Sequence, residues 1–283
     1  MNLSYTKDDL DDFLKVCDSV EIMNNGLNMP DMFTFYFFLK KLQPTSIIES
    51  GVDGLSIKII RLALGADVKI TCLDPLDVSG YIDTNPNTTY LTGSNFTDFS
   101  KLDLSGDYTT LCFFNDGQNA KQRMFQAKDK GFVHLFFNCN HPVNGGATYT
   151  IQHMIDNDTR DIFEVGTQLP ESTNTLPQQY LHKLDAMKFI HTYFILPNVF
   201  PSTIEIIGGS FPCEHVLDQN DAETYAPFYE KASTYSWNTY VKLNSPLNPP
   251  DPPVTLPEGP PPVETAAAGD ATSEATAAGD ATS

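Results

Sequence analysis

Basic residues are scarce in this sequence: 17 lysines and arginines stand against 36 aspartates and glutamates, and the formal net charge is −19. This balance repels polyanions, so a nucleic-acid partner or an anionic membrane surface is disfavoured unless a local basic patch exists. The bases between positions 121 and 130 look like solvated helix faces rather than such a patch: Lys121, Arg123, Lys128 and Lys130. We therefore expect neither nucleic acid nor a membrane as a partner.

The sequence also lacks a C-x-x-C pair and any long hydrophobic run. Its longest apolar run, around residues 33–39, is too short to span a bilayer, and the polar, acidic residues 1–14 do not have the pattern of a signal peptide. Two of the five cysteines, Cys72 and Cys112, lie in apolar strand patterns that are typical of buried, reduced thiols. These features predict a cytoplasmic protein.

Neither G-x-G-x-x-G nor G-x-x-x-x-G-K-[ST] occurs, so the dinucleotide fingerprint and the P-loop are both absent. Residues 44–75 nevertheless predict a strand ending at Glu49 and Gly51, an amphipathic helix from Leu55, and a second strand ending at Asp74. This unit opens a doubly wound α/β sheet, in which ligands bind at the carboxyl ends of the strands. Asp74 is placed there to accept hydrogen bonds from a ribose diol. Alternatively, the glycines only allow a tight turn and Asp74 caps the strand end.

The remaining periodicity predicts a Rossmann-like, mixed seven-stranded sheet with helices on both faces. The further helix candidates are 6–16, 32–42, 118–130, 149–155, 177–190 and 222–233, and the further strand candidates are 89–91, 108–114, 132–137, 193–199, 204–207 and 237–243. We divide the chain into an N-terminal helical segment that packs on the core (1–43), a Rossmann-like domain (44–245) and a proline-rich, low-complexity tail (246–283) that we expect to be disordered.

Several strand candidates end in small polar or acidic residues, which parallel strands would bring to one edge of the sheet. Five blocks carry a resemblance: I-I-E-S-G-V at 47–52, L-D-P at 73–75, N-F-T-D-F-S-K-L-D at 95–103, F-F-N-D-G-Q-N-A-K-Q-R at 113–123 and G-F-V-H-L-F-F-N-C-N-H-P at 131–142. They resemble a family of class I S-adenosylmethionine (SAM)-dependent methyltransferases of bacteria, algae and large algal viruses, which includes sugar (rhamnose-type) O-methyltransferases. The similarity covers about residues 22–155 and extends more weakly to 243.

This resemblance implies SAM as the cofactor, a small-molecule or glycan hydroxyl as the acceptor, and the cytoplasm of a cell or of a virus-infected host as the location. It leaves open whether the protein forms a homo-oligomer. The implied cofactor residues are Glu49 and Gly51 by the methionine part, Asp74 at the ribose, and Asn95, Asp98 and Phe99 by the adenine, with Asn115 beside them. Near the acceptor it implies Asp116 as a catalytic residue and Gln118 as a substrate contact. The family histidine is Gly117 here, and we take His141, after the next strand, as the catalytic residue that could replace this base.

The sequence departs from the family where a magnesium or manganese ion would bind. The family pattern F-F-D-D-H-Q reads Asn115-Asp116-Gly117 here, and F-E-D-N has become Asn138-Cys139-Asn140, so only Asp116 and the neutral Asn140 remain as ligands. One carboxylate makes a weak site for a hard divalent ion.

Each of the remaining polar residues also has a structural reading. Asp116 could cap a helix that starts at Gln118, His141 could be a surface residue, and Cys139 could be a nucleophile or a packed thiol. The chain is therefore either an active O-methyltransferase or a degenerate, catalytically silent relative that binds a ligand or partner.

Overall fold

The computed structural model describes residues 3–17, 28–141, 149–155, 188–200, 215–230 and 235–244. The chain divides into two units, residues 1–249 and 250–283, and the second unit lies outside the described residues. The strand candidate 204–207, most of the helix candidate 177–190 and the whole tail from 246 also lie outside them.

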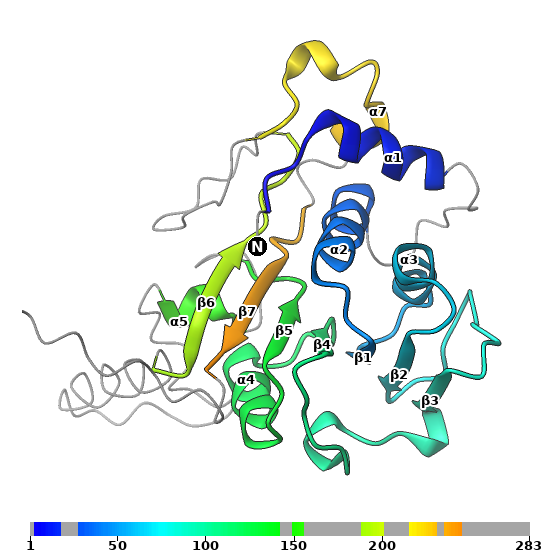
Figure 1. Cartoon of the computed structure of the whole chain (residues 1–283), viewed down its shortest axis with the longest axis vertical. Coiled ribbons are helices and arrows are strands. Elements are labelled where there is room, and N and C mark those ends of the chain that lie inside the picture. The colour runs from blue at the N-terminus through cyan, green and yellow to red at the C-terminus, as the bar shows by residue number, and fades with distance from the viewer. Residues whose placement is uncertain are drawn as a thin grey trace, which may run out of the picture. The chain divides into compact units, whose positions relative to one another are not determined.

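A seven-stranded mixed sheet forms the centre of the described chain, as predicted (Figure 1). Its order is β3-β2-β1-β4-β5-β7-β6; the first five of these strands are parallel, and β7 is antiparallel to both β5 and β6. The bounds are β1 Ser46–Ser50, β2 Lys69–Asp74, β3 Thr88–Thr92, β4 Thr110–Phe114, β5 His134–Phe137, β6 Ile190–Ile195 and β7 Thr239–Leu243. The sixth strand ends at Ile195, whereas the sequence pattern placed it over 193–199.

Helices cover both faces of this sheet. On one face, α1 (Lys7–Cys17), α2 (Met29–Leu42) and α3 (Leu55–Leu64) share a hydrophobic core with Ile47, Phe113 and Phe136. On the other face, α4 (Ala120–Asp129) and α5 (Ile151–Ile155) pack with Ile48 and the neighbouring strand residues. Successive strand residues point to opposite faces, which is why Ile47 and Ile48 belong to different cores. A short helix, α7 (Ala226–Glu230), packs on α2.

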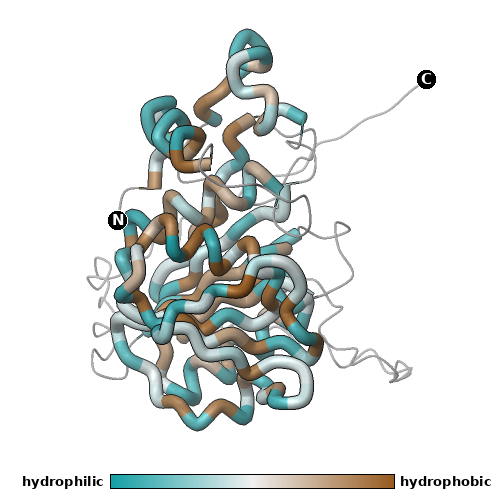
Figure 2. The backbone as a smooth tube through the Cα atoms, turned by 90° about the vertical axis from the view of Figure 1, so that its right-hand side faces the viewer, coloured by the Kyte–Doolittle hydropathy of each residue, from teal (hydrophilic) through white to brown (hydrophobic). Residues whose placement is uncertain are grey.

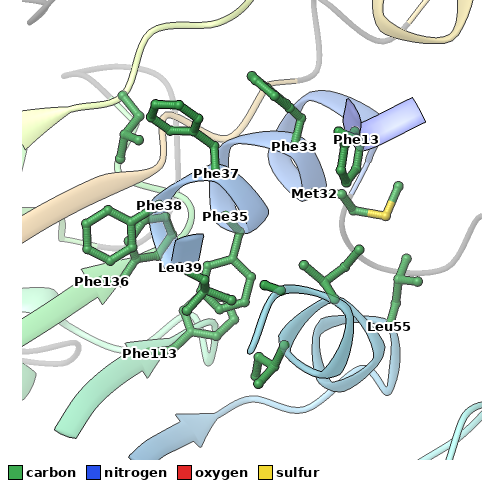
Figure 3. Packing of buried hydrophobic residues seen from close by; sticks show 14 of the residues in the cluster. Phe13, Met32, Phe33, Phe35, Phe37, Phe38, Leu39, Leu55, Phe113 and Phe136 are labelled. Atoms are coloured by element: carbon green, nitrogen blue, oxygen red, sulfur yellow. The ribbon is translucent and has the colours of Figure 1, made fainter. Parts of the chain in front are cut away.

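In Figure 2, hydrophobic segments (brown) recur along the helices and strands of the described chain. Such segments are needed to form a core on both faces of the sheet. In Figure 3, Phe35 and Phe38 point from α2 toward Phe113 and Phe136 of the sheet, and Phe13 of α1 lies near Phe33. The ring centroids of Phe35 and Phe113 are 4.3 Å apart. Offset and edge-to-face ring pairs add about 0.5–1.5 kcal/mol each beyond the buried area, so α2 is a central packing element.

Helix α2 begins three residues earlier than predicted. Asn28 is its N-cap and accepts a hydrogen bond from the Asp31 amide at 3.1 Å, and Pro30 occupies the first turn, where the missing N–H is harmless. The helix candidate 32–42 had left both residues outside the helix. Within the described ranges, no helix is long and apolar enough to cross a membrane.

Candidate functional site

The carboxyl ends of β1 and β4 lie side by side, at the point where the strand order reverses. Ser50 is paired with Phe114, and the Asn115 amide donates to the Ser50 carbonyl at 2.8 Å. Gly51 follows with φ +87°, and a Cβ there would lie 2.7 Å from Asp116 Cα and 2.5 Å from the Asn115 carbonyl carbon. Glycine is therefore required both by the backbone angle and by the close approach of the β4 end. Switch points of this kind are where doubly wound sheets bind ligands.

Asp74 ends β2 beside this turn. Its Oδ2 accepts a hydrogen bond from the Val52 amide at 2.9 Å, and its Oδ1 accepts one from the Leu76 amide at 2.8 Å. A carboxylate has about four acceptor positions, so each oxygen keeps one after these bonds. Asp74 thus orders the glycine turn, as the structural reading has it, and it can still accept hydrogen bonds from a diol.

Glu49 lies on the α3 face of β1 and is fully buried. Its Oε1 is hydrogen-bonded to the Ser56 hydroxyl, while its Oε2 has no hydrogen-bond partner among the described residues. Burial raises the pKa of Glu49 well above its ordinary value, and the nearby Asp53 and Asp74 charges raise it further. Glu49 therefore holds its proton more tightly than a free carboxyl group does, and its bond to Ser56 ties β1 to the start of α3.

The three residues predicted beside adenine are in different environments. Asn95 ends a short 3-10 helix (η1, Gly93–Asn95) and is exposed. Phe99 is fully buried in the core of the α4 face, 4.9 Å from the Phe114 ring between centroids. Asp98 is partly exposed and paired with Arg123. Burial of Asp98 opposes ionisation, but hydrogen bonds from Arg123 and Ser100 outweigh it and lower the pKa of Asp98.

The prediction that Arg123 lies on a solvated helix face is wrong, because this residue is only 6% exposed. Helix α4 buries Ala120, Arg123, Met124 and Ala127, which follow the i, i+3, i+4, i+7 spacing of one helix face. Arg123 Nε donates to Asp116 Oδ2 at 2.8 Å, and its two terminal nitrogens donate to the two oxygens of Asp98 at 3.2 and 2.9 Å. The helical spacing was the signal in the sequence that placed Arg123 inward.

Asp116 is held by other contacts as well. Its Oδ2 accepts a hydrogen bond from the Ser50 hydroxyl at 2.7 Å, and its Oδ1 accepts one from the Gln118 amide at 3.1 Å. The cap of α4 is Asn119 rather than Asp116, because the Asn119 side chain accepts the Gln122 amide. Asp116 therefore stands in a turn before the helix and contacts the ends of β1 and α4.

A small pocket of about 20 Å³ lies at the ends of β4 and β5. Asp116, Gln118, Arg123 and Asn140 are among the residues that line it. A space of this size holds about one water molecule. Gln118 is exposed beside the pocket, where its amide can reach a bound acceptor.

Asn140 does not present a ligand oxygen to this pocket. Its Oδ1 accepts the Gln152 amide at 3.0 Å, and its Nδ2 donates to Thr239 at 2.8 Å and to Tyr193 at 3.1 Å. Within the described residues there is no group of three or more His, Cys, Asp or Glu side chains that could hold a metal ion. The residues present therefore do not fit the magnesium or manganese site that the resemblance implies.

His141 and Cys139 follow β5. His141 is half-buried, and burial together with the nearby His153 lowers its pKa. Burial, with a smaller contribution from the Asp31 charge, raises the pKa of Cys139. Cys139 is therefore a thiol at neutral pH, as the packed reading expects, and His141 is neutral and able to accept a proton.

Asn115 and Asn138 stand at the two neighbouring strand ends, and Asn138 Nδ2 donates to Asn115 Oδ1 at 2.7 Å. Two amides can pair in this way because each carries a donor and an acceptor. The Asn115 side chain is thus hydrogen-bonded to Asn138 at the end of β5. This amide pair joins the two strand ends at positions where the family pattern has acids.

No family model matches this chain, and no curated protein matches it. Solved structures do match, among them CmcI with Mg and SAM, at 16% identity and a TM-score of 0.36, over 59% of this chain and 64% of the CmcI chain, which is less than two thirds of its length. The O-methyltransferase TomG from Streptomyces achromogenes, in complex with SAM, matches at 11% identity over 86% and 92% of the two chains, with a TM-score of 0.39.

An O-methyltransferase from Bacillus cereus, in complex with SAH, matches at 10% identity over 85% and 92% of the two chains, with a TM-score of 0.39. Likeness at this level assigns neither a family nor an activity to this chain. Its class rests on its own sheet, which defines a Rossmann-like α/β protein with polar residues gathered at the carboxyl edge.

Proposed function

We propose that this protein is a SAM-dependent O-methyltransferase that acts on a sugar, a glycan or another small hydroxyl compound. The observation that carries the proposal is Asp74, which stands at the end of β2 beside the Gly51 turn and keeps one acceptor position on each carboxylate oxygen. Two adjacent acceptors at a switch point are the recognition chemistry for a ribose diol. The sequence blocks that resemble the methyltransferase family supply the choice of SAM among nucleoside ligands.

Bound SAM would supply a methyl group on a positively charged sulfur. The chain would have to orient the acceptor hydroxyl and remove its proton. Gln118 at the pocket rim can orient the hydroxyl, and Asp116 has one acceptor position left on Oδ1 after the Gln118 amide is counted. His141, which is neutral at physiological pH, is the candidate proton acceptor.

The engagement of Asp116 and Asn140 by other side chains favours a second function: a catalytically silent protein with the same fold that binds a ligand or partner. Asp116 accepts hydrogen bonds from Ser50, Gln118 and Arg123, and Asn140 uses both ends of its amide inside the protein. The pocket between them has about 20 Å³ of space. A protein of this second kind would keep the cofactor-binding residues but would not catalyse methyl transfer.

Calorimetric titration with S-adenosylhomocysteine (SAH), followed by turnover assays with SAM and a panel of sugars and glycans, separates these functions. The methyltransferase proposal expects SAH binding and a methylated product that Asp116→Ala abolishes. Binding without any product across the panel favours the silent protein. Failure to bind SAH at millimolar concentration removes the methyltransferase proposal.

A further inference from the structure

Asp98, Arg123 and Asp116 form a continuous chain of ion pairs between the predicted adenine side and the small pocket. The guanidinium lies between the two carboxylates, with Nε on Asp116 and the terminal nitrogens on Asp98. The side chain of Arg123 is 7% exposed, and that of Asp116 is 13% exposed. Arg123 is therefore a nearly buried cation that lines the pocket.

The guanidinium is fixed on every side. Besides the two carboxylates, one terminal nitrogen donates to Gln126 Oε1 at 2.9 Å, and the guanidinium carbon lies 6.0 Å from the centroid of the Phe99 ring. Arginine is always charged in proteins, and its planar fork forms strong hydrogen bonds with carboxylates. Two negative charges and one positive charge thus meet at the ends of η2 (Phe99–Lys101), β4 and α4.

A divalent metal does not fit at the same place. It would need Asp116, whose Oδ2 is already shared by Ser50 and Arg123, and it would lie beside the guanidinium charge. The second predicted ligand, Asn140, directs its Oδ1 to the Gln152 amide instead. A hard cation requires several oxygen ligands at once, and here Asp116 offers the one remaining acceptor position on its Oδ1 while Asn140 directs its oxygen elsewhere.

We infer that Arg123 is the resident cation of the acceptor pocket. It is a positioning residue that holds Asp116 in place and balances its negative charge, which a divalent metal would otherwise do. The claim that a methyl acceptor binds in this pocket rests on the proposed function, whereas the claim that Arg123 excludes a metal ion does not. The pocket then operates without a divalent metal. Removal of the guanidinium leaves two carboxylates, Asp98 and Asp116, without their shared counter-ion, and such a pair attracts Mn²⁺.

The test is a titration of the full-length protein with Mn²⁺ alone, in which electron paramagnetic resonance measures the concentration of free Mn²⁺. We expect no site on the wild-type protein tighter than about 1 mM, and binding at least about tenfold tighter in Arg123→Ala. Arg123→Lys keeps the positive charge and should show no gain, and Arg123→Ala combined with Asp116→Asn should lose the gain. Lys128→Gln is the matched control, because it removes a base from the same helix whose partners are Asp129 and Phe189.

Wild-type Mn²⁺ binding that Asp116→Asn abolishes would overturn the inference, and so would Mn²⁺ affinity in folded Arg123→Ala that equals that of Lys128→Gln. Circular dichroism checks that each variant is folded, and Arg123→Gln replaces Arg123→Ala where the latter does not fold. SAH is titrated into the same preparations. Absence of SAH binding to the wild-type protein would end the proposed function and leave the Mn²⁺ result to decide the inference by itself.

Discussion

Two neighbouring parts of one sheet edge differ in how their polar groups are used. In the half that we propose for the cofactor (the cofactor half), which comprises Gly51 and Asp74 at the ends of β1 and β2, the Asp74 carboxylate accepts two backbone amides and keeps acceptor positions. In the half that we propose for the methyl acceptor (the acceptor half), which comprises Asp116, Asn138 and Asn140 at the ends of β4 and β5, the side chains bond to internal partners. Most of the departures of this sequence from the methyltransferase family pattern lie in the second half, since the first half differs only in a glycine turn that is one residue shorter.

The difference has a physical cause. Acids at neighbouring strand ends repel one another and need a metal or a base between them, whereas the amides of Asn115 and Asn138 pair directly. The remaining acid, Asp116, is neutralised by Arg123 from the adjacent helix. In this molecule an amide pair and an internal cation therefore balance the polar groups at these two strand ends.

The largest expected effect comes from the place where the two halves touch. Gly51→Ala forces a side chain into φ +87° and against the backbone of Asn115 and Asp116. The strain and the contact together should lower the free energy of unfolding by about 5 kcal/mol. Gly117→Ala is the control, because Gly117 also has a positive φ of +61° but nothing lies within 4 Å of an added Cβ.

Gly117→Ala should cost about 1 kcal/mol, which is the effect of the backbone angle alone. Urea unfolding of both variants measures the contrast. Equal losses of unfolding free energy would mean that the two strand ends do not approach as closely as described, and the comparison between the halves would lose its common boundary.

A buried acid behind the acceptor half should make stability depend on pH. Asp31 is 1% exposed and accepts hydrogen bonds from the Ser236 amide and hydroxyl, both at 2.9 Å. Burial outweighs these bonds and raises the pKa of Asp31 from 3.8 to about 7. The folded state thus holds its proton more tightly, so this stabilisation is present below pH 4 and is lost as pH rises through 7.

Asp31→Asn keeps both contacts if the amide donates to the Ser236 hydroxyl, and it removes the titration. Relative to wild type, the variant should gain stability between pH 4 and 8, by at most about 4 kcal/mol for a shift of this size. Urea unfolding at pH 5, 7 and 9 measures the difference, with Asp12→Asn as the control at a side chain that is 74% exposed. Parallel curves for wild type and Asp31→Asn would show that Asp31 is ionised throughout.

Periodicity predicted most of the fold, because the strands and helices that form the two cores have short-range patterns. Residues 44–75 were predicted as β1, α3 and β2, and these elements run Ser46–Ser50, Leu55–Leu64 and Lys69–Asp74. The strand ends were predicted to share one edge, and the parallel register of β1 with β2 and β4 confirms this. The start of α2 was missed because the capping geometry of Asn28 overrides the turn propensity of its neighbours.

The contacts within the site were harder to predict, since they join residues far apart in the chain. Arg123 reaches Asp98 across 25 positions and Asp116 across 7. Nothing local distinguishes it from the less buried bases of the same helix except its place among buried residues. Asp31 pairs with Ser236 across 205 positions. Only the folded chain brings such pairs together.

A smaller effect should separate structural amides within the acceptor half. Asn140 is 1% exposed and bonds to Gln152, Tyr193 and Thr239, so Asn140→Ala leaves several buried groups unsatisfied and should cost about 3 kcal/mol of unfolding free energy. Asn138 is half-buried and pairs with Asn115, so Asn138→Ala should cost about 1 kcal/mol. Thermal unfolding measures both variants. A larger loss for Asn138→Ala would contradict the inference that the contacts of Asn140 stabilise this half more than the Asn115–Asn138 pair does.

The last comparison tests the cofactor half through binding alone. Asp74→Asn keeps an oxygen for one backbone amide but replaces an acceptor with a donor, so it should weaken SAH binding about tenfold, which is about 1.4 kcal/mol. Asp77→Asn removes the same charge at an exposed position three residues on and should change the affinity less than about twofold. Calorimetric titration of the two variants decides between a diol-binding Asp74 and one that only orders the glycine turn. In the second case, Asp74→Asn would lower the melting temperature and leave the SAH affinity of the folded protein equal to that of Asp77→Asn.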